Sequence, residues 1–569
     1  MSFLAALTTG LLLWACYPPV NFGALVWLAL LPLLSVLWPR WESPEHGDRP
    51  QSGAAAPPPR PAWWRPTRAP GAFLHGYLAG ATFFLLNLNW LRHVTAPGMV
   101  MLALYLALYP ALWALFAATV GRPRRRNSRR ELARAVVATA AAWTGLEWLR
   151  GIALTGFGWN GLGVPLAGFA HGSLAQWAEW IGVTGLSFFI VAPAALLVAR
   201  WQSLNTPPAT PWTRRTPALA VTAASTLAAI TALATVGARR ARSIQSASKT
   251  PAPLTIALIQ PNIPQENKNA YESFDGIAAT LARLTRQAFD TEPKPDLLVW
   301  PESSLPAPFY YEGVQEVLRQ GNTLGDFVHV LGIDDQELDA YFNAIAVFRG
   351  DPLRAALHHK VHLVPFGEYL PARGLFGRFD FIREQLPGDF KAGDAVSPLP
   401  LPPPPLPDSA HITGGLPAPL PAPSFTLIPL VCFEDTLGRV ARRFARPEPQ
   451  LIVNVTNDAW FKDSAGADQH LANAVFRSIE LRRPMVRAAN TGVTAVIDEL
   501  GRITHRLPRL REGQLKTTIA QPTVSKSTLY ARFGDSFSVA LLALAALSPL
   551  ITRRPPPRET PPNPASGLA

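Results

Sequence analysis

The chain has 569 residues, of which 48% are hydrophobic and only 16% are charged, and its formal net charge is +13. A charged share this low, together with long uncharged runs, excludes an ordinary soluble globular protein. The basic balance would suit a nucleic-acid-binding protein. The densest basic cluster, at 122–130, lies between two apolar runs, so we interpret it as a topology signal of a membrane protein and expect no nucleic-acid partner.

Eight apolar segments predict a membrane bundle of about eight transmembrane helices. The run at 98–120 carries no charge over 23 residues, which is enough helix to cross a hydrocarbon core about 30 Å thick. The run at 71–91 contains His75, Asn87 and Asn89, whose polar groups we expect to face other helices rather than lipid. The eight segments are 3–16, 22–38, 71–91, 98–120, 135–155, 181–199, 217–238 and 535–552.

The distribution of basic residues predicts the orientation of this bundle, because cytoplasmic loops retain Lys and Arg. If the spans alternate from a cytoplasmic N-terminus, the connections at 17–21 and 156–180 lie outside and hold no basic residue. The basic run at 238–243 also lies outside, but it precedes a long domain, where charge has little effect. The inside stretches hold five, seven, three and three basic residues, and they are 39–70, 121–134, 200–216 and the tail after 552.

The predicted organisation is a bundle, an outer domain and one returning span. The bundle covers 1–243, with about seven spans and a proline-rich cytoplasmic insert at 41–70. The outer domain covers 244–534 and contains a second proline-rich insert at 398–423; such inserts are expected to be extended rather than packed. A final span at 535–552 leads to a cytoplasmic tail at 553–569.

The outer domain is predicted to be an α/β domain. Short β-branched runs alternate with helical patterns, which we place at 273–289 and 468–489. Several runs are apolar throughout, as expected for strands that are covered on both faces. The predicted strands are 254–260, 297–303, 328–334, 343–348, 426–435, 451–458 and 494–498.

Three candidate functional residues follow apolar runs of this domain, where an α/β fold presents its chemistry. They are Glu302, Lys360 and Cys432. A thiol reacts as the thiolate, an ammonium stabilises both a thiolate and an oxyanion, and a carboxylate can take the thiol proton. The residues alone leave open that Cys432 is a buried structural thiol, Glu302 a helix cap and Lys360 a solvated surface charge.

The surrounding motifs favour the chemical interpretation. "WPESSLP", "HHKVHLVPFGEYLP", "LVCFED" and "NVTNDAWF", in this order, resemble the carbon–nitrogen hydrolase (nitrilase) superfamily, whose Glu–Lys–Cys triad lies on an αββα sandwich. With the apolar spans and "TGFGWN", the chain resembles the apolipoprotein N-acyltransferase family within it. The resemblance implies that Glu302 is the general base, Cys432 the nucleophile and Lys360 the electrostatic stabiliser.

The resemblance also extends to residues around the triad. It implies that Glu368, in "PFGEY", is a second essential glutamate, and that Glu434, two residues after the nucleophile, supports the site. Two positions depart from the family pattern. Phe433 stands where a tyrosine often follows the cysteine, so a role for that hydroxyl is in doubt, and Asn269 lies near the place of a missing tryptophan.

The function implied by the resemblance is acyl transfer at the bacterial inner membrane, with the catalytic domain on the periplasmic side. Cys432 would take an acyl chain from a phospholipid as a thioester and pass it to the N-terminal amine of an S-diacylglyceryl-cysteine apolipoprotein. A membrane-tethered amidase and a non-catalytic scaffold are the alternatives. We expect no cofactor. We also expect no metal, because the histidines of 358–362 lack partners in the sequence. We interpret His470 as structural.

Overall fold

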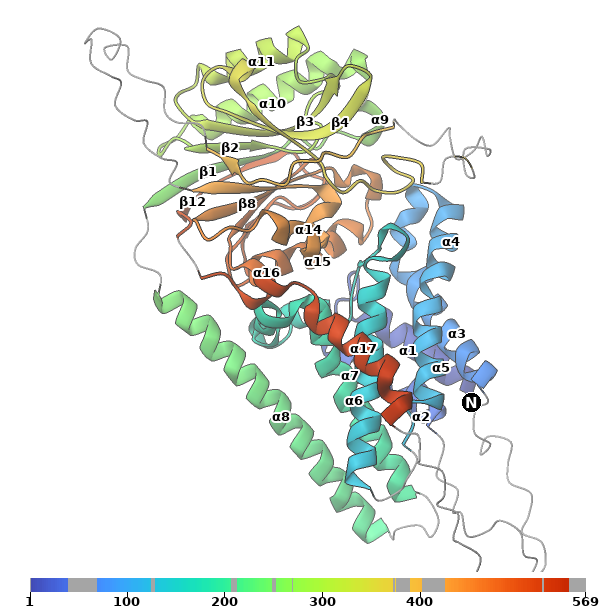
Figure 1. Cartoon of the computed structure of the whole chain (residues 1–569). Coiled ribbons are helices and arrows are strands. Elements are labelled where there is room, and N and C mark those ends of the chain that lie inside the picture. The colour runs from blue at the N-terminus through green and yellow to red at the C-terminus, as the bar shows by residue number, and fades with distance from the viewer. Residues whose placement is uncertain are drawn as a thin grey trace, which may run out of the picture.

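The computed structural model of the chain describes residues 2–38, 69–123, 128–205, 212–247, 252–268, 270–371, 374, 389–401, 425–523 and 526–551. Figure 1 shows an α/β domain that is seated on one end of a group of long helices. The predicted proline-rich inserts between 41 and 68 and between 402 and 423, the tail at 553–569 and Asn269 lie outside the described residues.

Each of the eight apolar segments contains helix. Four helical stretches, at 69–87, 96–119, 174–204 and 213–246, are long and apolar enough to cross a membrane. The others are shorter, or begin with charged residues as α6 does. The helices are α1 (Ser2–Ala15), α2 (Leu31–Leu37), α3 (Ala69–Asn87), α4 (Ala96–Leu106), α5 (Leu108–Thr119), α6 (Arg129–Arg150), α7 (Ala178–Asn205), α8 (Trp212–Ala247) and α17 (Ser536–Ile551).

Small residues allow these helices to pack closely. A Cβ added at Gly76 of α3 would lie 2.5 Å from the Pro110 carbonyl oxygen of α5, and one at Gly145 of α6 would lie 2.7 Å from the Leu542 Cα of α17. Close backbone approach of this kind is how helices associate where apolar burial alone gives little drive.

The α/β domain consists of two six-stranded sheets packed face to face. The first sheet has the order β12-β1-β2-β3-β4-β5 and the second β11-β10-β9-β8-β7-β6. The first contains β1 (Pro253–Gln260), β2 (Leu297–Trp300), β3 (Val328–Glu337), β4 (Ala340–Phe348), β5 (Ala356–His359) and β12 (Gly513–Ala520). The second contains β6 (Leu399–Pro400), β7 (Thr426–Val431), β8 (Gln450–Thr456), β9 (Met485–Ala489), β10 (Ala495–Ile497) and β11 (Ile503–Arg506).

Helices cover the outer face of each sheet. Helices α10 (Phe274–Phe289) and α11 (Glu312–Asn322) pack on the first sheet, and α15 (Gly466–Leu481) packs on the second (Figure 1). Apolar side chains of both sheets meet between them, among them Val299, Val330 and Val453. The predicted αββα sandwich is therefore confirmed.

One predicted helix is too long. The pattern at 468–489 was expected to be a single helix, but α15 ends at Leu481 and residues 485–489 form strand β9. Arg482 adopts a left-handed conformation with φ of 52°, and Pro484 follows two residues later. Proline disfavours a helical residue before it, so the helix ends and an extended segment begins.

Helix α15 also faces the long helices, through buried polar contacts. Gln469 Nε2 donates to the Asn87 side-chain oxygen at 3.0 Å and to the Pro18 carbonyl at 2.8 Å. Gln469 Oε1 accepts from the indole nitrogens of Trp90 at 3.1 Å and Trp159 at 2.9 Å. Asn87 therefore contacts protein, as expected from the sequence, and the helix that covers the second sheet is fixed to the bundle.

The apolar helices predict that the chain stays in the membrane fraction after washing with high salt and carbonate, and that detergent releases it. Burial of uncharged helices in hydrocarbon does not depend on ionic strength. Immunoblotting of pellet and supernatant after each wash measures this. Release of the intact chain by salt alone would contradict the membrane-spanning interpretation.

Candidate active site

The four predicted residues Glu302, Lys360, Glu368 and Cys432 lie together where strands of both sheets end. Glu302 lies two residues after β2, and Lys360 and Cys432 directly follow β5 and β7. The Lys360 Nζ donates to Glu368 Oε1 at 2.8 Å and lies 4.0 Å from Glu302 Oε1. The Cys432 thiol interacts electrostatically with both Glu302 and Lys360. The structure thus places a carboxylate, an ammonium and a thiol in one site.

Glu302 is held so that both carboxylate oxygens are fixed. Its Oε1 accepts from the Asn343 side-chain amide at 2.7 Å, and its Oε2 accepts from the Asn457 backbone N–H at 2.6 Å. Gly332 of β3 permits this close approach, since a Cβ there would lie 2.4 Å from the Glu302 Cα. Burial raises the pKa of Glu302, with Lys360 acting in the opposite direction. A raised pKa suits a group that must both accept and return a proton.

Lys360 is a buried cation between two carboxylates. Its side chain is 1% exposed. Burial by itself disfavours the ammonium, but Glu368 and Glu302 outweigh that effect and hold the pKa of Lys360 well above its ordinary value. Lys360 is therefore a fixed positive charge, which can stabilise developing negative charge but cannot serve as a base.

Cys432 occupies a sharp turn at the end of β7. Its φ of 51° lies in the left-handed region, which is unusual for a residue with a side chain. Burial, reinforced by Glu302, raises the pKa of the thiol well above its ordinary value, and Lys360 opposes this. The resting sulfur is consequently protonated, so the site needs a base to form the thiolate.

Glu434 ties the strand that carries the thiol to the segment that carries the ammonium. Its carboxylate is fully buried and accepts from the backbone N–H groups of Val361 at 2.9 Å and His362 at 2.8 Å. The other oxygen accepts from the Val431 N–H at 2.9 Å. Burial raises the pKa of Glu434 to about 7, whereas Lys360 and these three donors favour the ionised form.

Phe433 faces the bundle. Its ring stacks on Phe157 at 6.0 Å and on Trp159 at 6.2 Å between centroids, with interplanar angles of 19° and 10°. Phe157 and Trp159 belong to the connection between α6 and α7. The residue after the nucleophile thus forms part of an aromatic contact with the membrane-associated part of the chain.

Two further ionisable groups, the buried Lys268 and the half-buried Asp334, flank Glu302, and the sequence analysis missed both. Lys268 Nζ donates to the Ser303 carbonyl at 2.8 Å, and burial lowers its pKa to about 8. Asp334 accepts from the Ser303 hydroxyl at 2.8 Å, and burial raises its pKa to about 6. Asp334 lies at the end of the predicted strand 328–334. The position of Lys268 in the sequence gave no indication that its side chain lies near Glu302.

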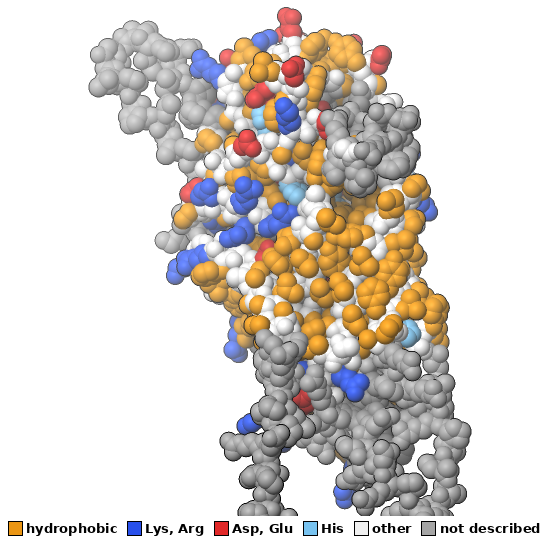
Figure 2. All heavy atoms as spheres, turned by 45° about the vertical axis from the view of Figure 1, so that its right-hand side comes forward, with side chains coloured by type: hydrophobic (Ala, Val, Ile, Leu, Met, Phe, Trp, Pro, Cys, Tyr) orange, Lys and Arg blue, Asp and Glu red, His pale blue; other side chains and the backbone are white. Residues whose placement is uncertain are grey.

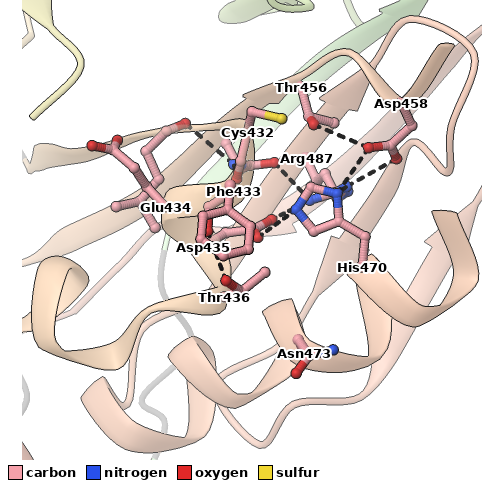
Figure 3. A network of polar contacts seen from close by, with 12 residues as sticks. Cys432, Phe433, Glu434, Asp435, Thr436, Thr456, Asp458, His470, Asn473 and Arg487 are labelled. Atoms are coloured by element: carbon pink, nitrogen blue, oxygen red, sulfur yellow. Dashed lines mark hydrogen bonds and ion pairs between the residues drawn. The ribbon is translucent and has the colours of Figure 1, made fainter. Parts of the chain in front are cut away.

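A buried charge cluster of Asp435, Asp458, His470 and Arg487 lies beside the thiol (Figure 3). His470 Nε2 lies 2.9 Å from Asp435 Oδ1, and His470 Nδ1 lies 2.8 Å from Asp458 Oδ1. Arg487 pairs with both carboxylates. Burial opposes the charge of His470, but Asp435 and Asp458 raise its pKa to about 9. With two cations and two anions, the buried charge cluster is neutral overall.

This cluster supports the backbone of Cys432. The Arg487 guanidinium donates to Asn454 Oδ1 at 2.8 Å, and Asn454 Nδ2 donates to the Cys432 carbonyl at 3.2 Å. Asp435 lies three residues after Cys432 in the same turn. The contacts of His470 are those of a structural residue, as the sequence analysis expected.

The histidines of 358–362 include one with neighbours that the sequence did not indicate. The histidines of 358–362 were expected to lack partners, but His359 Nε2 lies 2.9 Å from Asp335 Oδ2 and 3.9 Å from Glu337 Oε1. These three residues offer ligand atoms within 4.8 Å of one another. The partners come from β3, which lies beside β4 rather than next to the histidines in sequence, so spacing did not reveal them.

Two family models match successive parts of the chain. Residues 255–528 match the family model described as carbon–nitrogen hydrolase, which defines the class of the α/β domain. Residues 53–196 match the model described as apolipoprotein N-acyltransferase N-terminal domain. The carbon–nitrogen hydrolase from Helicobacter pylori G27 aligns with a TM-score of 0.34 and 14% identity, covering 54% of this chain and 97% of that one.

Curated relatives cover both parts of the chain. The apolipoprotein N-acyltransferase of Bradyrhizobium diazoefficiens is 34% identical over 84% of this chain and 85% of its own length. That of Shewanella oneidensis is 30% identical over 85% of this chain and 88% of its own. The chain therefore belongs to the apolipoprotein N-acyltransferase family.

Glu434→Gln is expected to destabilise the site. A carboxamide turns an NH2 group toward backbone N–H donors, so at least one buried donor loses its acceptor, at a cost of about 1–3 kcal/mol. Thermal unfolding in detergent measures this as a lower Tm than that of wild type. Glu448→Gln, at an exposed position, is the matched control, and equal Tm values for the two variants would contradict the bracing role.

The buried charge cluster predicts a pH-dependent stability. Because folding raises the pKa of His470 from 6.5 to about 9, its contribution is fully present below pH 6.5 and is lost as pH rises through 9. The loss is on the order of 3 kcal/mol. Unfolding measured between pH 6 and 10 should show a stability decline in wild type that is absent in His470→Gln. The same decline in both proteins would contradict a charged His470.

Proposed function

We propose that this chain transfers an acyl chain from a membrane phospholipid to the N-terminal amine of an S-diacylglyceryl-cysteine apolipoprotein. Its relatives are named as apolipoprotein N-acyltransferases, which supports N-acylation of lipoproteins. The observation that carries the proposal is the meeting of Glu302, Lys360 and Cys432 in a domain that is seated on apolar helices.

In the first step Cys432 is the nucleophile and Glu302 the base. Glu302 accepts the thiol proton, and the sulfur attacks the ester carbonyl of the phospholipid. The Lys360 ammonium and the backbone N–H of Phe433 stabilise the oxyanion of the tetrahedral intermediate. When the carbon–oxygen bond breaks, Glu302 returns the proton to the leaving alkoxide, so that lysophospholipid departs and a thioester remains on Cys432.

In the second step the amine of the apolipoprotein replaces the thiol. The amine attacks the thioester, Glu302 accepts one of its protons, and Lys360 again faces the oxyanion. The carbon–sulfur bond breaks, an amide forms, and the proton on Glu302 returns to Cys432. Both steps use the same three groups, which explains why one carboxyl with a raised pKa serves as base and then as acid.

The neighbouring glutamates have positioning roles in this proposal. Glu368 fixes the Lys360 ammonium through its 2.8 Å contact and also accepts from the Val364 N–H at 2.7 Å. Glu434 links the segment after Lys360 to the strand that precedes Cys432, through hydrogen bonds to the backbone of each. Phe433 stacks on Trp159 and carries no hydroxyl, so no proton transfer depends on this position.

The same proposal places the domain at the periplasmic surface of the bacterial inner membrane, above about eight spans. Helix α8 supports a lipid environment, because an 18-residue apolar stretch within 213–246 has no residue buried in the protein. Such a surface is not stable in water. The proposed division is a bundle at 1–243, a catalytic domain at 244–534, a span at 535–552 and a cytoplasmic tail.

Acyl capture tests the proposed reaction. Detergent-purified protein is incubated with a phospholipid that carries a labelled sn-1 chain, without acceptor, and covalent label is measured before and after hydroxylamine. We expect wild type to acquire label that hydroxylamine removes, Cys432→Ala to acquire none, and Glu302→Gln to acquire it at least about 100-fold more slowly.

The control is Cys16→Ala, which removes the other cysteine, a buried thiol that directly follows α1. Its labelling should equal that of wild type. Absence of label on folded wild-type protein would overturn the acyltransferase mechanism and favour an amidase or a scaffold.

A further inference from the structure

We propose that four arginines at the base of the α/β domain bind the phosphate groups of anionic phospholipids. We call Arg439, Arg442, Arg443 and Arg532 the arginine rim. The inference rests on the membrane placement proposed above, but it concerns a surface separate from the thiol, carboxylate and ammonium of the candidate active site.

Contacts fix the arginine rim at the ends of two bundle helices. Arg439 of α14 (Gly438–Ala441) donates to the Thr155 carbonyl at 3.2 Å, five residues after α6 ends at Arg150. Arg442 donates to the Arg532 carbonyl at 3.2 Å. Arg532 lies in α16 (Leu529–Phe533), a short helix that directly precedes α17. If α6 and α17 cross the membrane, the rim lies at the level of the lipid headgroups.

The positive charge of the arginine rim is largely uncompensated. None of its four members forms an ion pair with a carboxylate in the part of the chain that the structure describes. Asp535, whose charge acts on Arg439, already accepts from the Tyr530 hydroxyl at 2.9 Å. Arg443 and Arg532 are exposed. A surface with several guanidinium groups and few anions is complementary to phosphate.

Two members also have hydrogen-bonding capacity that the described protein groups do not use. The Nε atoms of Arg439 and Arg442 are buried, and neither has a hydrogen-bond partner among the described residues. Arg439 lines a cavity of about 60 Å³ together with Thr436, Tyr530 and Asp535. An oxygen-bearing group in this cavity would lie beside Arg439, whose Nε–H has no acceptor among the described residues.

Exposed apolar side chains adjoin the arginine rim and identify lipid, rather than a soluble anion, as the occupant. Leu154 is 80% exposed beside the Thr155 contact, and Leu529 and Phe533 of α16 are 47% and 64% exposed. Figure 2 shows basic side chains gathered on the domain just above a broad apolar surface. Apolar and basic groups side by side are typical of the headgroup region, where the first insert and the second pair with phosphate.

Native mass spectrometry of the full chain tests the inference. Detergent-purified Cys432→Ala protein, which cannot consume lipid by acyl transfer, is titrated with phosphatidylglycerol or phosphatidylcholine of identical chains. We expect preferential retention of phosphatidylglycerol, and a roughly fivefold lower preference after Arg443→Gln with Arg532→Gln. These two side chains are exposed and not ion-paired among the described residues, so the fold should survive, which thermal unfolding checks.

A matched variant separates a local site from net charge. Arg319→Gln with Arg354→Gln removes the same charge from exposed side chains near α11, on the far side of the domain (Figure 1). It should keep the full preference, as should Arg443→Lys with Arg532→Lys. Equal losses in both Gln variants, or no preference in the parent protein, would overturn the inference. Acyl capture on wild type reports separately on the proposed reaction.

Discussion

The buried ammonium of Lys360 is the charge on which the arrangement of the site depends. An isolated ammonium away from water is strongly unfavourable, so the fold must bring anions to it. Glu368 does so directly at 2.8 Å, and Glu302 stands at 4.0 Å. Asn343 donates to both carboxylates, at 2.7 Å and 3.0 Å, and so fixes their separation. The position of the Glu302 carboxylate follows from this need to neutralise Lys360.

The second constraint is the left-handed backbone conformation of Cys432, which hydrogen bonds to the neighbouring backbone groups must stabilise. Asn454 and Arg487 hold its carbonyl, while Glu434 holds the N–H of the preceding residue. His470, in the buried charge cluster, comes from α15, the helix that also carries Gln469 toward the bundle. One helix therefore contacts both the support of the nucleophile and the apolar helices. The turn that carries the thiol is thereby held in a fixed relation to the apolar helices.

The sequence predicted those parts of the site that follow directly from a strand. Glu302, Lys360 and Cys432 each stand after an apolar run, and an α/β domain follows from strands that are covered on both faces. The αββα layers were implied by the family resemblance. Glu368 and Glu434 needed the family resemblance, since a glutamate in a loop has no periodic signal. Their roles in catalysis stay predictions.

Longer-range contacts were beyond the sequence. Arg487 and Asp435 are 52 positions apart, and His470 and Asp435 are 35 apart, so only the folded sheet brings them together. The C-terminal end of α15 was predicted too far along the chain, because the helical spacing of apolar residues continues past Arg482, although Pro484 indicated the boundary. The His359 partners on β3 were missed for the same reason as the buried charge cluster.

The fate of the acyl chain tests the central claim most directly. Purified protein would be given a phospholipid with an isotopically labelled sn-1 chain and an S-diacylglyceryl-cysteine peptide, and the products analysed by mass spectrometry. The account predicts that the labelled chain appears as an amide on the peptide's N-terminal nitrogen, in amounts equal to the lysophospholipid formed. Label found only as free fatty acid, with the peptide unchanged, would contradict it.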